Sequence, residues 1–352
     1  MALSQVGLER LNTDTTDKIG TNKNVVINGS FSIWQRGTSI DSQGNGQNDY
    51  TADRFAIGHN NSHMAAVTQQ DGTGTNAGFR YCARIQRDSG NSQTDQLRFH
   101  TAFETNNVIP LRGKKLTLSF YARKGANYSE ANSKITNVLV ATGENTDGNP
   151  NAYAGGSWTN ASNIINGTDA TLTTDWQRFT YTSSTVSNTT NSMIIEFRVT
   201  PVGTAGANDY YEITGVQLEI NSVATDFEHR SFAQELALCQ RYFYEICLHS
   251  QSTTPICQAT DFDGSFSYGN IPFPVSMRTK PSMGQVAGTN YFKLYGGTAT
   301  IPINAANKLV FSEAGLTGAE IKINNEGNSG MGRANFLRAT NSAARLNFIA
   351  EL

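Results

Sequence analysis

Between residues 24 and 230 the chain alternates apolar and polar residues with a period of two. The alternation recurs in GFRYCARIQR, KKLTLSFYARKG, DWQRFTYTSST and NSMIIEFRVTP. In the last of these, Ile195 and Phe197 share one face, opposite Glu196 and Arg198. Because successive side chains of a strand point to opposite faces, the pattern predicts half-buried strands with one solvent-facing side. Such strands are typical of antiparallel sheets.

Turn signals separate these strands at Asn28-Gly29, Asp71-Gly72, Asp147-Gly148 and Asn166-Gly167. Strands and turns together predict an all-β protein in which residues 24–230 form a β-sandwich of the jelly-roll type. A second β-rich stretch follows Ile246 and contains prolines that indicate edge strands or strand ends. Residues 246–352 are therefore expected to form a second β-sandwich.

Two segments bracket the first sandwich. The opening segment, NVVINGSFSIWQRG at 24–37, predicts a first β-strand with tight turns, and the closing segment at 210–245 predicts a last strand, a polar turn and a helix. Ser231 and Gln234 have the spacing of a capping box. Four residues then recur at helical spacing: Phe232, Leu236, Cys239 and Phe243. Residues 231–245 are therefore predicted to be a helical connector between the two sandwiches.

The first 23 residues are polar, with scattered leucines and a valine. They fit either a frayed chain end or an arm that orders against a partner. The predicted organisation is thus an attachment arm at 1–23, a jelly roll at 24–230, a connector helix at 231–245 and a β-sandwich at 246–352.

Composition and charge narrow the function classes. The 352 residues carry a net charge of −2 with no basic run, which argues against nucleic-acid binding. No apolar run approaches the roughly 20 residues that a membrane-spanning helix needs, so no membrane insertion is expected. The N-terminus lacks the pattern of a signal peptide, and the four cysteines are irregularly spaced. These features fit synthesis in a reducing cytoplasm.

Several long strings occur in a co-linear order: NVVINGSF…WQRGTS, YTADRFAIG, LRGKKLTLSFYARKGAN, WQRFTYT and ITGVQLEINSVATDFEHRSFAQELALCQRYF. With these strings the chain closely resembles a family of tailed-phage and prophage structural proteins that carry a carbohydrate-binding-like jelly roll. The resemblance covers nearly everything after residue 23. It implies a virion component, such as a short tail fibre, that assembles as a homotrimer. The N-terminal arm would then attach to other virion proteins, and the partner outside the virion would be a host-surface glycan.

The opening segment also looks like the start of sugar-binding modules that begin with an Asn-Gly-x-Phe-Glu pattern. Those modules often hold a structural calcium ion near their first and last strands. Here Ser32 replaces the glutamate, and the last strand reads TGVQLE where the related pattern has paired aspartates. Glu219 is the remaining candidate ligand for a structural Ca²⁺, although a hard cation needs several converging oxygens.

Sugar recognition requires an exposed aromatic face together with polar groups for the hydroxyls. Trp158 lies in a Gly/Ser/Asn stretch, five residues after Tyr153, and the two are candidate carbohydrate-binding residues if a loop presents them. The alternative is that Trp158 plugs the end of the sandwich. Tyr50 and Tyr128 flank loops and are weaker candidates for the same role.

Catalytic motifs are missing from the sequence. It contains no Gly-x-Ser-x-Gly elbow, no His-Glu-x-x-His and no P-loop. Together with the resemblance, which implies a fibre protein of the virion that adheres to glycans, the missing motifs predict a non-enzymatic protein. Two alternatives stay open: a head or neck decoration protein without sugar binding, and a polysaccharide-degrading enzyme.

Overall fold

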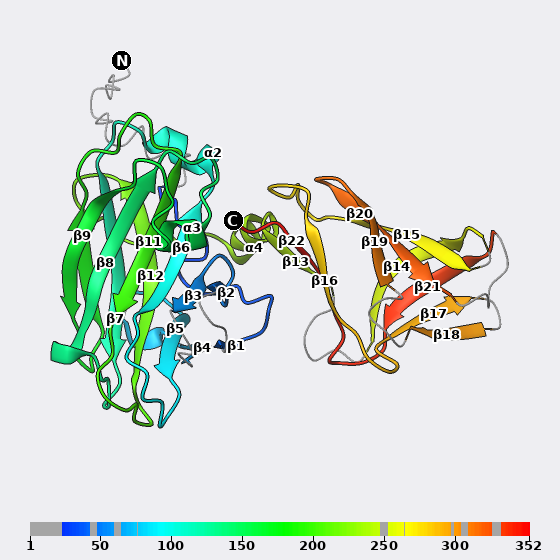
Figure 1. The fold of residues 1–352 in the computed structure, drawn as a ribbon, viewed down its shortest axis with the longest axis horizontal. Helices are drawn as coiled ribbons and strands as arrows, with labels where there is room; N and C mark the ends of the chain where they lie inside the picture. Colours follow the sequence, from blue (N-terminus) through cyan, green and yellow to red (C-terminus); the bar gives the residue numbers. More distant parts are fainter. Residues whose placement is uncertain are drawn as a thin grey trace, which may run out of the picture.

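The computed structural model describes residues 23–42, 48–59, 65–75, 77–246, 253–263, 265–296, 299–303, 309–325 and 332–352. The arm expected at 1–23 lies almost wholly outside these described residues. The described part is dominated by antiparallel sheets arranged as two sandwiches (Figure 1). The predicted all-β fold with two β-sandwich domains is confirmed.

The first sandwich pairs two six-stranded sheets. One sheet has the order β1 (Ser39–Ser42), β4 (Ala65–Asp71), β5 (Tyr81–Arg87), β12 (Tyr210–Ile220), β7 (Leu116–Lys124) and β10 (Gln177–Thr182). The other has the order β2 (Asn48–Tyr50), β3 (Ala56–His59), β6 (Leu97–Phe103), β11 (Ser192–Val199), β8 (Lys134–Gly143) and β9 (Ser162–Thr171). Short helices connect these strands: η2 (Thr73–Thr75), α2 (Thr105–Val108), η3 (Ile109–Leu111), η4 (Ala131–Ser133) and α3 (Pro150–Ala154).

An aromatic cluster forms one end of the core between these two sheets. The ring centroid of Phe55 lies 4.7 Å from that of Phe31 and 5.3 Å from that of Phe99. All three side chains are fully buried. Because close aromatic pairs add to the free energy of burial, this cluster ties the opening segment to β6.

The opening segment is not a strand. The structure describes residues 23–38 completely and shows only bends and turns before β1 at Ser39, so the strand predicted at 24–37 is wrong. Asn28 and Phe31 have φ angles of 60° and 53°, which interrupt an extended backbone. The segment nevertheless lies against β12, where the Val216 N–H donates to the Gly29 oxygen at 2.9 Å. A Cβ at Gly29 would lie 2.0 Å from the Val216 oxygen, so only glycine fits this approach.

The predicted connector helix is α4 (Phe232–Gln240), which lies between the two sandwiches (Figure 1). Its capping box is present, because the Gln234 N–H donates to Ser231 Oγ and the Ser231 N–H donates to Gln234 Oε1. Among the described residues, no helix combines the length and the apolar character needed to cross a bilayer.

The buried face of α4 differs from the predicted apolar face. Phe232 is 64% exposed, whereas Glu235 and Cys239 are the buried residues of the helix. The Glu235 carboxylate can be buried because the Arg230 guanidinium donates to it at 3.2 Å. Phe243 does not continue the helix and lies in β13 (Phe243–Glu245).

The second sandwich packs a three-stranded sheet against a seven-stranded sheet around one apolar core. The smaller sheet has the order β13, β22 (Arg345–Ile349) and β16 (Ser282–Val286). The larger has the order β18 (Ala299–Ile303), β17 (Phe292–Gly296), β21 (Ala334–Ala339), β14 (Thr254–Asp261), β15 (Phe266–Pro272), β20 (Gly318–Asn324) and β19 (Leu309–Ala314).

The C-terminal residues lie at the joint between the two sandwiches, beside α4 (Figure 1). Glu351 forms ion pairs with Arg54 and, at 3.1 Å, with Arg36, both from the first sandwich. The Arg54 guanidinium also lies 3.6 Å from the ring centroid of Tyr242. Arg278 donates to the backbone oxygen of Glu351 at 2.7 Å. The joint is therefore a polar network that closes around the end of the chain.

We expect Glu245, at this joint, to make stability depend on pH. Burial raises the pKa of its carboxyl from 4.5 to about 7, opposed by the nearby Arg345 and Arg36 guanidinium groups. The folded chain then holds a proton that the unfolded chain releases, so stability falls as pH rises from about 4.5 to about 7. Urea unfolding at pH 5 and pH 7.5 should show a smaller loss for Glu245→Gln than for the wild type. Equal losses in the two proteins would contradict the assignment to Glu245.

Candidate functional site

Charged residues occupy the outer side of the sheet that contains β6 and β11. Along β6, Phe99 enters the core, and Arg98 and His100 alternate with it on the outer side. Along β11, the outer positions include Glu196 and Arg198. We call the outer side defined by Arg98, His100, Glu196 and Arg198 the arginine face.

The register of β6 and β11 sets the geometry of the arginine face. Arg98 lies directly opposite Arg198, and His100 lies directly opposite Glu196. Arg198 Nε donates to Glu196 Oε2 at 2.7 Å, and Arg198 Nη2 donates to the same oxygen. Within the described part of the chain, the Arg98 guanidinium forms no hydrogen bond or ion pair, although only 7% of the residue is exposed.

The arginine face carries one uncompensated positive charge, because it holds two arginines and one carboxylate, that of Glu196, which pairs with Arg198. Burial lowers the pKa of the Arg98 guanidinium, and the Glu196 carboxylate opposes that shift. Glu196 is 1% exposed, so the solvent-facing side predicted for this strand is wrong. Part of this outer side is covered by α3 and Trp158, which pack against Ala102 and Ile194.

His100 adds a buried polar group without adding charge. Burial, with a further contribution from Arg98, lowers the pKa of its imidazole to about 3, so the ring is neutral at physiological pH. Its Nδ1 lies 3.5 Å from the backbone oxygen of Arg98, and its Nε2 is enclosed with no hydrogen-bond partner among the described residues. Buried polar atoms without partners are uncommon in folded proteins, and such atoms point to bound water or ligand.

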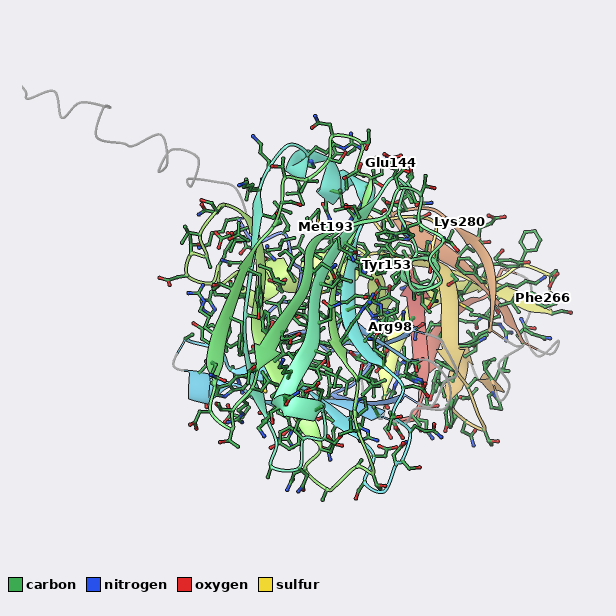
Figure 2. The ribbon with its side chains drawn as sticks, turned by 60° about the vertical axis from the view of Figure 1, so that its left-hand side comes forward. Arg98, Glu144, Tyr153, Met193, Phe266 and Lys280 are labelled. Carbon is green, nitrogen blue, oxygen red and sulfur yellow. The ribbon has the colours of Figure 1, made fainter. Side chains whose placement is uncertain are left out.

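Tyr153 stands beside the arginine face on the short helix α3 (Figure 2). The helix begins after Asn149, whose side chain accepts from the Asn151 and Ala152 N–H groups at its N-terminus. The Tyr153 ring centroid lies 5.8 Å from the Arg198 guanidinium carbon, and its hydroxyl donates to Asn163 Oδ1 at 3.2 Å. The structure thus brings one predicted sugar-binding residue, Tyr153, to the charged face.

Trp158 is 5% exposed, so the loop does not present it to solvent as expected. Its indole N–H donates to the Asn149 oxygen at 3.0 Å, and its ring lies 5.0 Å from that of Tyr153. Glycines make room for the indole, since a Cβ at Gly143 or Gly148 would lie within 2.9 Å of it. Trp158 packs with Tyr153 on the outer side of the sheet, against Ala102, Leu139, Ala141 and Ile194. It is therefore buried, but on the face of the sheet and not as a plug at the end of the sandwich.

The two weaker candidates lie away from the arginine face. Tyr128 packs on the core, its hydroxyl donates to the Lys134 oxygen at 2.6 Å, and burial raises its pKa well above the usual value. Tyr50 lies at the joint, where its hydroxyl donates to the Leu352 oxygen at 3.4 Å. Burial, followed by the Glu351 carboxylate, raises the pKa of Tyr50 to about 12. Neither ring is presented as an open aromatic face.

Glu219 does not fit the predicted calcium site. It is 3% exposed, and its two carboxylate oxygens accept from Gln217 Nε2, the Thr225 N–H and the Thr225 hydroxyl at 2.8–2.9 Å. The nearby Glu228 carboxylate accepts the Asn24 N–H at 2.9 Å. Among the described residues, no group of three or more potential metal-ligating His, Cys, Asp or Glu side chains occurs. These carboxylates serve as hydrogen-bond acceptors that fix the bracketing segments to each other.

A separate hollow of about 460 Å³ lies where the bracketing segments meet. Aromatic side chains from both segments, from the loop before β5 and from the start of β5 line it: Trp34, Phe79, Tyr81, His229 and Phe232. Trp34 is partly buried against the core and donates its indole N–H to the Phe31 oxygen at 2.7 Å. This hollow has a size suited to a small ligand.

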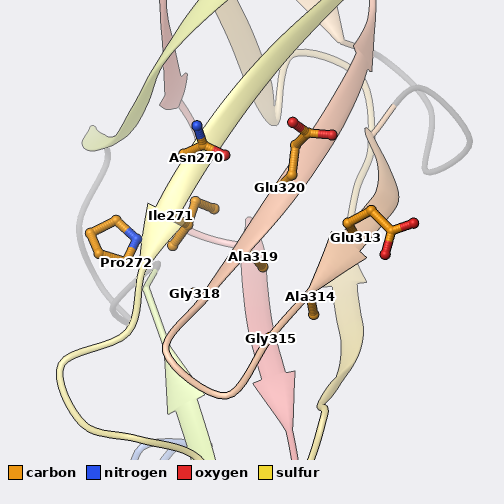
Figure 3. Close-up of a pocket in the computed structure, with 9 residues that line it drawn as sticks. All are labelled: Asn270, Ile271, Pro272, Glu313, Ala314, Gly315, Gly318, Ala319 and Glu320. Carbon is orange, nitrogen blue, oxygen red and sulfur yellow. The ribbon is translucent and has the colours of Figure 1, made fainter.

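A third depression, of about 480 Å³, lies on the second sandwich beside β15, β19 and β20 (Figure 3). Its charged side chains are the carboxylates of Glu313 and Glu320, and none of its lining residues is aromatic. It therefore lacks the stacking surface that a sugar ring requires.

Comparisons with known proteins give only distant structural similarities. No protein-family model matches the chain, and no curated protein matches it. The chain is similar to an enzymatically active domain of a tailspike protein from bacteriophage CBA120, with 14% identity, 56% of this chain and 22% of that chain covered, and a TM-score of 0.34. It is also similar to the module CBM4, with 20% identity and a TM-score of 0.31. This match covers 55% of this chain and 98% of that chain. A third similar structure is TmCBM61 in complex with β-1,4-galactotriose, with 13% identity and a TM-score of 0.31. This match covers 57% of this chain and 100% of that chain.

The chain thus spans about a fifth of the tailspike chain, at 22%. At these TM-scores the similarities identify no site on this chain.

Sequence reasoning missed the combination of Arg98, His100, Glu196 and Arg198 as a site. The signal was present as the outward positions of LRFHTAF and MIIEFRV, where charged or titratable residues occupy alternate places. The sequence pattern does not show that these residues are buried, because their burial depends on the part of the chain that covers the outer side of the sheet.

Proposed function

We propose that the chain is a glycan-binding adhesin and that the arginine face beside Tyr153 is its carbohydrate site. The observation that carries this proposal is a juxtaposition on the outer side of one sheet: the Arg98 side chain, 7% exposed and without an ion-pair partner among the described residues, and the enclosed His100 Nε2 lie near the aromatic ring of Tyr153. Sugar hydroxyls supply donors and acceptors to such groups, and an aromatic ring supplies a surface for the C–H face of the sugar.

We also propose that the protein is a non-enzymatic fibre component of a phage virion and that it assembles as a homotrimer. Its support is the co-linear resemblance of the sequence to tailed-phage structural proteins. A trimer would present three weak sites together, and linked sites gain avidity without new contacts. Sedimentation velocity of the full chain tests this part, since a trimer has about three times the 38.2 kDa mass of the chain.

Binding of the purified full chain to an array of bacterial surface glycans tests the function. Tyr153→Ala is expected to reduce binding to the best glycan about tenfold, which corresponds to roughly 1.4 kcal/mol of binding free energy. The matched control is Phe232→Ala, which removes an exposed ring from the hollow and leaves the arginine face unchanged.

Three outcomes would contradict the proposal. Loss of binding in Phe232→Ala with full binding in Tyr153→Ala would move the site to the hollow. The absence of binding to any glycan or to whole cells would favour the decoration protein. Release of new reducing ends from a bound polysaccharide would establish the enzyme instead.

A further inference from the structure

We propose that the glycan bound at the arginine face carries a carboxylate, as a uronic acid does, and that Arg98 pairs with it. This inference rests on the proposed glycan-binding function and names the class of sugar. It starts from the Arg98 side chain, which is 7% exposed and has no ion-pair partner in the described part of the chain.

The first argument is the cost of the unpaired charge. A guanidinium removed from water without a counter-charge is expensive, so buried arginines are nearly always paired. Other buried arginines of this sandwich follow the rule: Arg87 pairs with Asp209 at 2.9 Å, and Arg54 pairs with Glu351. Arg98 departs from the rule, and an anionic ligand group would restore it.

The second argument is the charge balance across the two strands. Arg98 and Arg198 lie directly opposite each other, and like charges in that position destabilise a sheet. Glu196 compensates Arg198, to which it is bound through Oε2 at 2.7 Å. A second carboxylate, from the ligand, would balance the charge of the arginine face, which would then hold two cations and two anions.

The third argument is geometric. A guanidinium presents a planar pair of N–H donors that matches the two oxygens of a carboxylate, and such bidentate pairs are among the stronger hydrogen-bonded contacts. The unpaired Arg98 side chain keeps some solvent contact, whereas the unpaired Nε2 of His100 is enclosed. Of these two unpaired groups, Arg98 is the more accessible to a ligand. Tyr153, beside Arg198, provides the ring on which the same sugar stacks.

The ligand test compares an oligogalacturonate with its carboxyl-reduced form, which keeps the chain and removes the charge. The wild type is expected to bind the acidic form at least about tenfold more tightly, and Arg98→Gln should abolish this preference. Equal binding of both forms, with Tyr153→Ala still impairing it, would overturn the inference and leave the glycan-binding function standing. Equal binding of dextran sulfate and oligogalacturonate would overturn it in favour of a general anion site.

A second measurement does not depend on finding the right sugar. Without ligand, Arg98→Met is expected to raise the Tm of the first sandwich by about 2–4 °C, because it removes an uncompensated buried charge. Arg84→Met is the control and should lower the Tm, since Arg84 is paired with Glu212. A lower Tm for Arg98→Met would show that Arg98 has a structural role and would overturn the inference. A higher Tm together with no glycan binding in any assay would count against the proposed function instead.

Discussion

Arg87→Met is expected to destabilise the first sandwich by about 3–5 kcal/mol. Arg87 is 3% exposed and Asp209 is 2% exposed, and the two form an ion pair at 2.9 Å. Arg87 also donates to the backbone oxygens of Asn91 and Gln93 at 3.0 and 2.7 Å. Methionine keeps much of the side-chain volume but leaves the Asp209 carboxylate buried without a counter-charge. Urea unfolding at pH 7 measures the loss.

A double variant separates charge from packing. Arg87→Met with Asp209→Leu removes both charges, so its loss of stability should be smaller than the loss for Arg87→Met alone. Two results would disagree with this account: a loss below about 1 kcal/mol for the single variant, or strictly additive losses in the double variant.

Phe99→Ala is expected to cost about 3–5 kcal/mol, because it opens a cavity where Phe99, Phe31 and Phe55 meet. The Phe99 ring lies 5.9 Å from Phe31 and 5.3 Å from Phe55, and all three are buried. Thermal or urea unfolding of the full chain, read by near-ultraviolet circular dichroism, measures the effect on the first sandwich.

The matched control is Phe336→Ala on β21, because that ring is 48% exposed. Its effect is expected to stay within about 0.5 kcal/mol, as for most surface substitutions. If Phe336→Ala cost as much as Phe99→Ala, the stability of the chain would not depend on the core cluster described here.

The sequence pattern was sufficient to predict strands wherever one face of a strand is apolar. The period-two segments around Phe120 and Phe197 became β7 and β11, and the capping box at Ser231 began α4 as predicted. The strand prediction for the opening segment was wrong, because turns at Asn28 and Phe31, and not strand pairing, position its apolar residues. Local alternation does not distinguish a strand from an irregular segment that lies against a strand.

The candidate site was harder to predict than the fold. The search for aromatic residues in polar loops identified Tyr153 and Trp158 as candidates. It did not predict that Trp158 is buried next to Tyr153. The arginine face depends on the register that sets Arg98 opposite Arg198, and register is a property of pairing between distant segments. The sequence around Arg98 does not indicate which residue of the neighbouring strand will lie opposite it.

A structure of the full chain with its best-binding oligosaccharide tests the central claim most directly. The account predicts sugar density on the arginine face, with a carboxylate at Arg98 and a sugar ring against Tyr153. Density in the hollow beside Phe232, or in the depression beside Glu313, with the arginine face empty, would contradict it.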